Sequence, residues 1–294
     1  MAAHADSPPL VVDLAAVEHA APELLGAKLA QLLAVRALGM EIPDGIALTT
    51  AALATWRRAG APRTDERLPD ALEPAFAAHY ARLAGRATGE TFVVRTSALE
   101  EDRPDASFAG QYASFLGVRG IDGVRAAIGA CWARLDAPHV DTYRAARGFE
   151  RSARAAVAVM PQVRADLAGV AFSVDPVRGA RDRLVLEIGP GTPAGVTDGV
   201  GRPAAIELDK HDGRVLRRTE GAATPDDAEL ALILARVVRL ERALGMPVDV
   251  EWGLVRAAAG PRFVVFQVRP ITALPPGPPG WDMRRSATRF SRRG

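Results

Sequence analysis

The 294-residue sequence has a single cysteine, Cys131, and no apolar run approaches the roughly 20 residues that a membrane-spanning helix needs. One cysteine excludes an internal disulfide framework. The first residues, MAAHADSPPL, lack the basic and apolar regions of a secretory signal, so we expect a cytoplasmic protein with no membrane partner. With 48% apolar and 24% charged residues, the composition predicts a folded chain of one large or two small domains.

Lysine is almost absent, because only Lys28 and Lys210 are lysines among 37 basic residues. This bias is most simply a coding bias, so a retained lysine either marks a place where a compact ammonium is needed or survives by chance. The sequence pI of about 9.0 owes much to the tail RRSATRFSRRG. Without that tail the body is mildly acidic, so nucleic acid is not an expected partner.

Several familiar site motifs are missing. The five histidines have no metal-ligand spacing, which argues against a zinc site. There is no GxSxG elbow and no Walker GxxxxGK[ST] motif, and the glycines of EIGPGTPAG do not follow GxGxxG. Cys131 lies in the helical stretch ACWARL, where a buried small side chain is favoured over a nucleophile.

Helical patterns dominate the first half of the chain and strand patterns the second. Apolar residues recur at helical spacing from Leu24 to Leu38, with Gly39 as a C-terminal cap, and again from Asp122 to Arg147, with a break at Pro138. The predicted strands are GIALTT, TFVVRTSAL, AAVAVMPQV, GVAFSV, RLVLEIG, AAIEL, VDVEWGL and RFVVFQVRP.

The segment DRPDASFAGQY suits neither a helix nor a strand and is predicted to be a long loop. A final helix is predicted with Thr224 as its N-cap, Pro225 in the first turn and Gly245 at its end. The two strands that follow it look like a hairpin, and PPGPPG then forms a spacer.

This hairpin carries a candidate site. Side chains two apart on a strand share a face. Asp249 and Glu251 therefore point to one side of their strand, and Gln267 and Arg269 point to one side of the partner strand. Such oxygen ligands suit Mg²⁺ bound together with nucleotide phosphates, whose charge Arg269 would offset. The alternative from the residues alone is a solvated face with a cross-strand ion pair.

A second candidate is the strand TFVVRTSAL, where Arg95 and Ser97 share a face. The loop SFAGQY after it could offer backbone N–H groups to a phosphate, with Gly110 allowing close approach. An arginine at this position could equally lie on the surface.

Taken together and in order, several stretches resemble the N-terminal nucleotide-binding domain of the phosphoenolpyruvate synthase and pyruvate phosphate dikinase family, which includes rifampicin phosphotransferases. The resemblance covers about Leu24 to Thr272. It rests on LLGAKLAQLLAVRALGMEIPDGIALTT, VVRTSALEEDRPDASFAGQY, CWARL…YRAARG, DLAGVAFSVDP, VLEIGPG and VDVEW…FQVRPIT.

The resemblance implies an α+β, ATP-grasp fold in which ATP and Mg²⁺ lie between two lobes. The expected divisions are residues 1–150 for a helix-rich N-terminal lobe, 151–274 for a strand-rich C-terminal lobe and 275–294 for a spacer and Arg-rich tail.

The same resemblance implies roles for individual residues. Lys28 and Arg95 would contact phosphates and act in catalysis with Arg269. The loop around Gly110, with Ser114, would cover the nucleotide. The remaining implied nucleotide-site residues are Glu251 and Gln267 as metal ligands, Asp249 in support of them, and Glu187 near the nucleotide.

Two departures from the family pattern are visible. Met160 stands where the family usually has glutamine, with Gln162 two places on, and Thr192 stands where an acid is expected. Base or ribose contacts are therefore expected to differ.

These 294 residues contain no Gly-Gly-x-Thr-Ser-His-like stretch of the family's phosphohistidine domain, which fits either a naturally separate domain or a part of a longer chain. We therefore expect an ATP- and Mg²⁺-dependent phosphotransferase acting on a small molecule or on a histidine of a partner protein. The alternative is a non-catalytic ATP-binding module whose tail docks on a partner.

Overall fold

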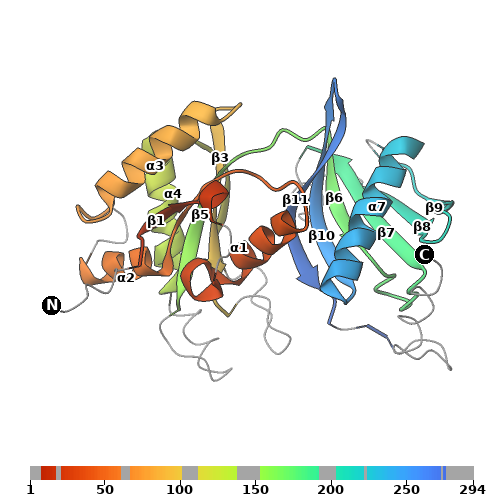
Figure 1. The fold of residues 1–294 in the computed structure, drawn as a ribbon, viewed down its shortest axis with the longest axis horizontal. Helices are drawn as coiled ribbons and strands as arrows, with labels where there is room; N and C mark the ends of the chain where they lie inside the picture. Colours follow the sequence, from red (N-terminus) through yellow and green to blue (C-terminus); the bar gives the residue numbers. More distant parts are fainter. Residues whose placement is uncertain are drawn as a thin grey trace.

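The computed structural model describes residues 8–17, 21–60, 67–100, 112–137, 153–191, 203–221, 224–272 and 274–275. Within these residues the chain has a mixed α/β fold with two antiparallel sheets and five α-helices (Figure 1). No helix in this described part is both long and apolar enough to cross a bilayer.

The first sheet has the strand order β1-β2-β5-β3-β4. Its strands are β1 (Val11–Asp13), β2 (Ile46–Leu48), β3 (Thr91–Ala98), β4 (Ser114–Arg119) and β5 (Ala155–Pro161). On β3, Phe92 and Val94 enter a core cluster with residues of helices α2 (Thr50–Arg58), α3 (Glu73–Arg86) and α4 (Gly120–Leu135). The alternation of side chains along β3 therefore leaves Val93 and Arg95 on the opposite face.

The second sheet has the order β11-β10-β6-β7-β8-β9. Its strands are β6 (Leu167–Phe172), β7 (Arg183–Pro190), β8 (Ala204–Asp209), β9 (Val215–Arg218), β10 (Val248–Ala257) and β11 (Gly260–Pro270). Helix α7 (Asp227–Leu244) packs against β10 and β11 (Figure 1).

Local hydrogen bonds set the start of α7, and a left-handed glycine ends it. The predicted N-cap, Thr224, is wrong: the N-cap is Asp226, whose carboxylate accepts from the Glu229 backbone N–H at 2.8 Å. The Glu229 carboxylate in turn accepts from the Asp226 N–H at 3.0 Å, which completes a capping box. At the other end Gly245 adopts φ 69°, so its prediction as the stop is confirmed.

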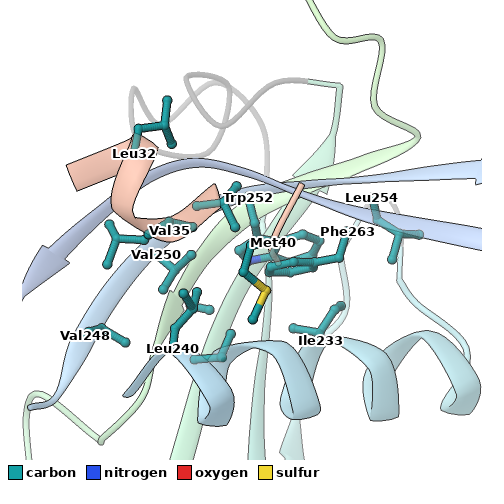
Figure 2. Close-up of a cluster of buried hydrophobic side chains, with 14 of the residues drawn as sticks. Leu32, Val35, Met40, Ile233, Leu240, Val248, Val250, Trp252, Leu254 and Phe263 are labelled. Carbon is teal, nitrogen blue, oxygen red and sulfur yellow. The ribbon is translucent and has the colours of Figure 1, made fainter. Parts of the chain in front are cut away.

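Helix α1 (Pro22–Ala37) links the two sheets. Its buried leucines belong to a core cluster that also holds Ala156 and Ala158 of the first sheet and Val250 and Trp252 of the second. Figure 2 shows part of this cluster, with side chains of α1, α7 and β10 gathered around Trp252. A short 3₁₀ turn, η1 (Leu14–Ala16), adds Leu14 to the same cluster.

Strand β5 lies beyond the expected lobe boundary at residue 150, yet it pairs with β2 and β3 of the first sheet. The change from one sheet to the other therefore comes between Pro161 and Leu167. The division into lobes stays a prediction. Strands β1, β4 and β9 were not predicted, and the proline spacer and Arg-rich tail lie almost wholly outside the described residues.

Candidate nucleotide and metal site

A cavity of about 520 Å³ has walls from both sheets and from α1. Six of the predicted site residues line it: Lys28, Arg95, Ser114, Glu251, Gln267 and Arg269. Residues far apart in sequence, from α1, β3, β4 and the β10–β11 hairpin, thus meet at one place.

Lys28 is positioned by a break near the start of α1. Gly26 has φ 73° and ψ 169°, which interrupts the helix, and a Cβ atom there would lie 2.0 Å from the Ser97 carbonyl oxygen. Just beyond the break, the Leu29 N–H donates to the buried Ser97 Oγ at 3.1 Å. The regular part of α1 therefore begins against β3, next to Lys28. Ser97, which sequence reasoning placed beside Arg95, holds this junction.

Arg95 connects the two sheets. Its Nη1 donates to the Phe266 carbonyl oxygen at 3.3 Å, and its Nη2 donates to Gln267 Oε1. Arg95 comes from the middle of β3, whereas both acceptors belong to β11. A planar guanidinium suits this double contact because its N–H groups point in fixed directions.

A bulge in β11 creates one of these acceptors. Glu251 pairs with Gln267, but the next residue, Trp252, pairs with Val265, so Phe266 is an extra residue with no direct partner. The Phe266 ring lies over Gly253, where a Cβ atom would come within 2.7 Å of it. Phe266 also lines the cavity. Sequence reasoning missed it, because a bulge depends on the pairing register.

In the predicted hairpin Asp249 lies opposite Arg269 and Glu251 opposite Gln267, so these four residues share one face of the sheet. Gln267 is only 4% exposed, and its Nε2 has no hydrogen-bond partner among the described residues. Asp249 is not among the described residues that line the cavity.

The other predicted residues lie apart from the cavity or outside the described chain. Glu187 pairs with Val170, which pairs with Glu251, so the backbones of the two glutamates are two strands apart, about 10 Å by ordinary sheet spacing. Glu187 is exposed and is not among the described lining residues. Gly110 and Thr192 fall outside the described residues.

Comparison with protein families matches residues 62–226 to the family described as pyruvate phosphate dikinase, AMP/ATP-binding domain. The chain belongs to this family. The match includes Arg95, Ser114 and Glu187, whereas Lys28 and the hairpin lie outside the matched stretch. The predicted resemblance to phosphoenolpyruvate synthases and rifampicin phosphotransferases is confirmed by curated relatives with these names.

Three of these relatives illustrate the similarity. The prodigiosin synthesizing transferase PigC of Serratia marcescens is 32% identical over 72% of this chain and 25% of its own length. A probable phosphoenolpyruvate synthase of Methanothermobacter thermautotrophicus is 35% identical over 54% of this chain and 23% of its own. The rifampicin phosphotransferase of Streptomyces sviceus is 36% identical over 54% of this chain and 18% of its own. The matched part is thus about a quarter or less of each relative.

Among solved structures, D-alanyl-alanine synthetase A of Vibrio cholerae aligns with 90% of this chain and 59% of its own at 14% identity, with a TM-score of 0.39. A similarity of this size carries no argument about the fold.

The charges on the cavity wall of this dikinase-family domain suit an anion. Four cationic side chains and one carboxylate are among the described lining residues: Lys28, Arg95, Arg134, Arg269 and Glu251. Arg134, from α4, was missed because nothing in its helical pattern shows that this position reaches the cavity. A wall with this excess of positive charge favours a polyphosphate.

Lys210 and Cys131, the other two residues that the sequence singled out, have surroundings that fit a structural role. Lys210 donates to the Arg181 carbonyl oxygen at 2.9 Å and to Glu241 at 2.6 Å, which ties the turn after β8 to α7. Burial lowers its pKa. Cys131 is buried in α4, and burial raises the pKa of its thiol to about 12.

Proposed function

We propose that this chain is an ATP- and Mg²⁺-dependent phosphotransferase that binds ATP between its two sheets in the manner of an ATP-grasp enzyme. The observation that carries the proposal is the convergence of Lys28, Arg95, Arg269 and Glu251 on one cavity. The family's description as an AMP/ATP-binding domain supports the ligand. The names of the relatives support the reaction class.

Phosphoryl transfer asks mainly for positioning and charge neutralisation from the protein. In the proposed site Lys28, Arg95 and Arg269 contact the phosphates and offset the negative charge on the transferring group. Ser114, with the loop around Gly110, covers the nucleotide. Glu187 lies further out on the same sheet face and is proposed to act on the nucleotide only at the margin of the site.

The hairpin fits Mg²⁺. The described residues contain no group of three or more His, Cys, Asp or Glu side chains that could hold a metal ion by themselves. Mg²⁺ needs no such group, because it is commonly bound by one or two protein oxygens together with substrate phosphates. Bound there, the ion would neutralise phosphate charge.

Glu251 and Gln267 are the proposed ligands. Asp249 supports them from the next cross-strand pair on the same face, Asp249–Arg269. Gln267 can ligate only through Oε1, the atom that accepts from Arg95 in this structure. We therefore propose that Arg95 exchanges Gln267 for phosphate oxygens when the nucleotide binds. Gln267 Nε2 is buried and has no partner in the part of the chain that the structure describes, which is consistent with a side chain that changes partners at this site.

Two acceptors fit this proposal: a small molecule, or a histidine on a partner protein. Chromatographic analysis of ATP incubated with the protein, Mg²⁺ and a small-molecule extract distinguishes the reactions. AMP with phosphate indicates dikinase-type chemistry, and ADP alone indicates a simple kinase. Phosphate found on a histidine of a co-purifying protein identifies the second kind of acceptor.

Glu251→Gln should lower turnover about 10²- to 10³-fold, the usual effect of losing one group that stabilises the transition state. Glu207→Gln is the matched control, because Glu207 lies on β8 and contacts Arg178 and Arg183 instead of the cavity. ATP binding without turnover under any acceptor would support the alternative, a non-catalytic ATP-binding module.

A further inference from the structure

The cavity has two chemically different ends. Along β3, Arg95 pairs with Ser114 on one side, and Lys28 and Glu251 line the cavity with them. Towards the start of β3, Val93 pairs with Met160, and the lining there is largely apolar. A nucleotide with its phosphates at Arg95 therefore has its base at the Val93 end.

A bulge in β4 builds one wall of the apolar end. Phe92 pairs with Val118 and Val94 with Phe115, so Leu116 and Gly117 together lie opposite the single residue Val93. Gly117 has φ 69° in this bulge, a left-handed conformation that glycine adopts readily. Leu116 lines the cavity and is 47% exposed, more than the other exposed large apolar side chains on described strands, which lie on β9.

Gln162 holds this bulge from the other side of β3. The Gly117 N–H donates to Gln162 Oε1 at 2.8 Å. Gln162 follows β5 directly, and β3 lies between β5 and β4, so the bond crosses the intervening strand. The Gln162 backbone is fixed as well, since its N–H donates to the Thr91 carbonyl oxygen at 2.8 Å. Gln162 itself lines the cavity.

We infer that Gln162 is a positioning residue for the nucleobase: by accepting from Gly117 it fixes the β4 bulge, so that Leu116 forms an apolar wall against the face of the base. This inference rests on the proposed nucleotide site and adds the residue that orders its base end. A purine or pyrimidine face is apolar and gains most from a wall that is already in place before binding. At the phosphate end Arg95 is held instead by Phe266 and Gln267 of β11.

The test compares two probes, ATP and inorganic tripolyphosphate, each with Mg²⁺. Tripolyphosphate carries the phosphates without ribose or base. Gln162→Leu keeps the size of the side chain but removes the acceptor for Gly117. It should weaken ATP binding about tenfold and change tripolyphosphate binding less than about twofold. The lost hydrogen bond loosens only the β4 bulge, and the bulge is proposed to contact the base and not the phosphates.

Leu116→Ala is the second variant, and it should weaken ATP binding in the same selective way. Because Leu116 is largely exposed, this variant stays informative even if Gln162→Leu does not fold. Glu90→Gln is the matched control. It removes the ion pair between Glu90, just before β3, and Arg119 at the end of β4, outside the cavity, and should change neither affinity.

Two outcomes overturn different claims. If the unmodified protein binds neither ATP nor tripolyphosphate, the proposed function fails. If it binds both, but the two variants leave the ratio of the affinities unchanged, the proposed function stands and the role of Gln162 is wrong.

Discussion

Gly26 and Ser97 approach so closely that the Ser97 carbonyl oxygen occupies the space of a side chain, 2.0 Å from where a Cβ of Gly26 would lie. Gly26 also has φ 73°, a conformation that glycine adopts far more readily than other residues. The contact sets the start of the regular part of α1 and hence the place of Lys28.

Gly26→Ala should therefore lower the free energy of unfolding by about 3 kcal/mol, since both the backbone conformation and the packing oppose a methyl group. Urea denaturation measures this change. Gly85→Ala in α3 is the control, because no atom lies within 4 Å of its Cβ position, and it should be neutral or slightly stabilising. Equal effects of the two substitutions would contradict the close approach.

Arg95→Lys should impair ATP binding and turnover almost as much as Arg95→Ala. A lysine ammonium keeps the charge but cannot hold the Phe266 carbonyl oxygen while it also directs N–H groups at the phosphate oxygens. Titration with ATP and steady-state kinetics of both variants provide the measurement. If lysine retained full activity, charge alone would account for the role of Arg95.

Gly253→Ala should displace the Phe266 ring, because the new methyl carbon would lie 2.7 Å from it. We expect weaker ATP binding, about tenfold, as the ring moves towards the cavity that it lines. The double variant Gly253→Ala with Phe266→Leu removes the clash and should recover part of the affinity. Isothermal titration of the wild type, the two single variants and the double variant checks this coupling, and strictly additive effects would count against it.

The stability of the protein should depend on Glu229 at acid pH. The hydrogen bond from Arg256 lowers the pKa of this carboxyl in the folded state. Its contribution is therefore complete above the unfolded-state pKa of about 4.3 and is lost as the pH falls through the lower folded-state pKa. Thermal unfolding from pH 7 to pH 3 should show a steeper acid loss in the wild type than in Glu229→Gln. Glu90→Gln, at an exposed surface pair, should keep the wild-type slope.

Cys131 should resist thiol reagents in the native state. Its pKa is raised to about 12 by burial, so the reactive thiolate is scarce at neutral pH. Ellman's reagent at pH 8 should label it only after denaturant is added. Rapid labelling of the native protein would show that α4 opens readily.

Local rules predicted much of the site. Strand alternation alone placed Asp249 and Glu251 on one face of β10 and Gln267 and Arg269 on one face of β11, and in the observed pairing these residues are cross-strand partners. The cap of α7 was misplaced by two residues, since Thr224 and Asp226 both suit the position and only the reciprocal bonds with Glu229 decide.

The bulges could not be predicted in this way. Phe266 and Leu116 reach the cavity because one strand of each pair carries an extra residue, and the extra residue is defined only by the partner strand. The contact between Arg95 and β11 likewise joins residues more than 170 positions apart.

The position of β5 has a consequence for any attempt to divide the protein. This strand lies between β2 and β3, and the cluster around α1 draws on both sheets. A polypeptide ending at residue 150 would lack the central strand of its own sheet and leave the inner face of α1 uncovered. The two halves should therefore melt in one cooperative transition, and neither should fold when it is produced alone.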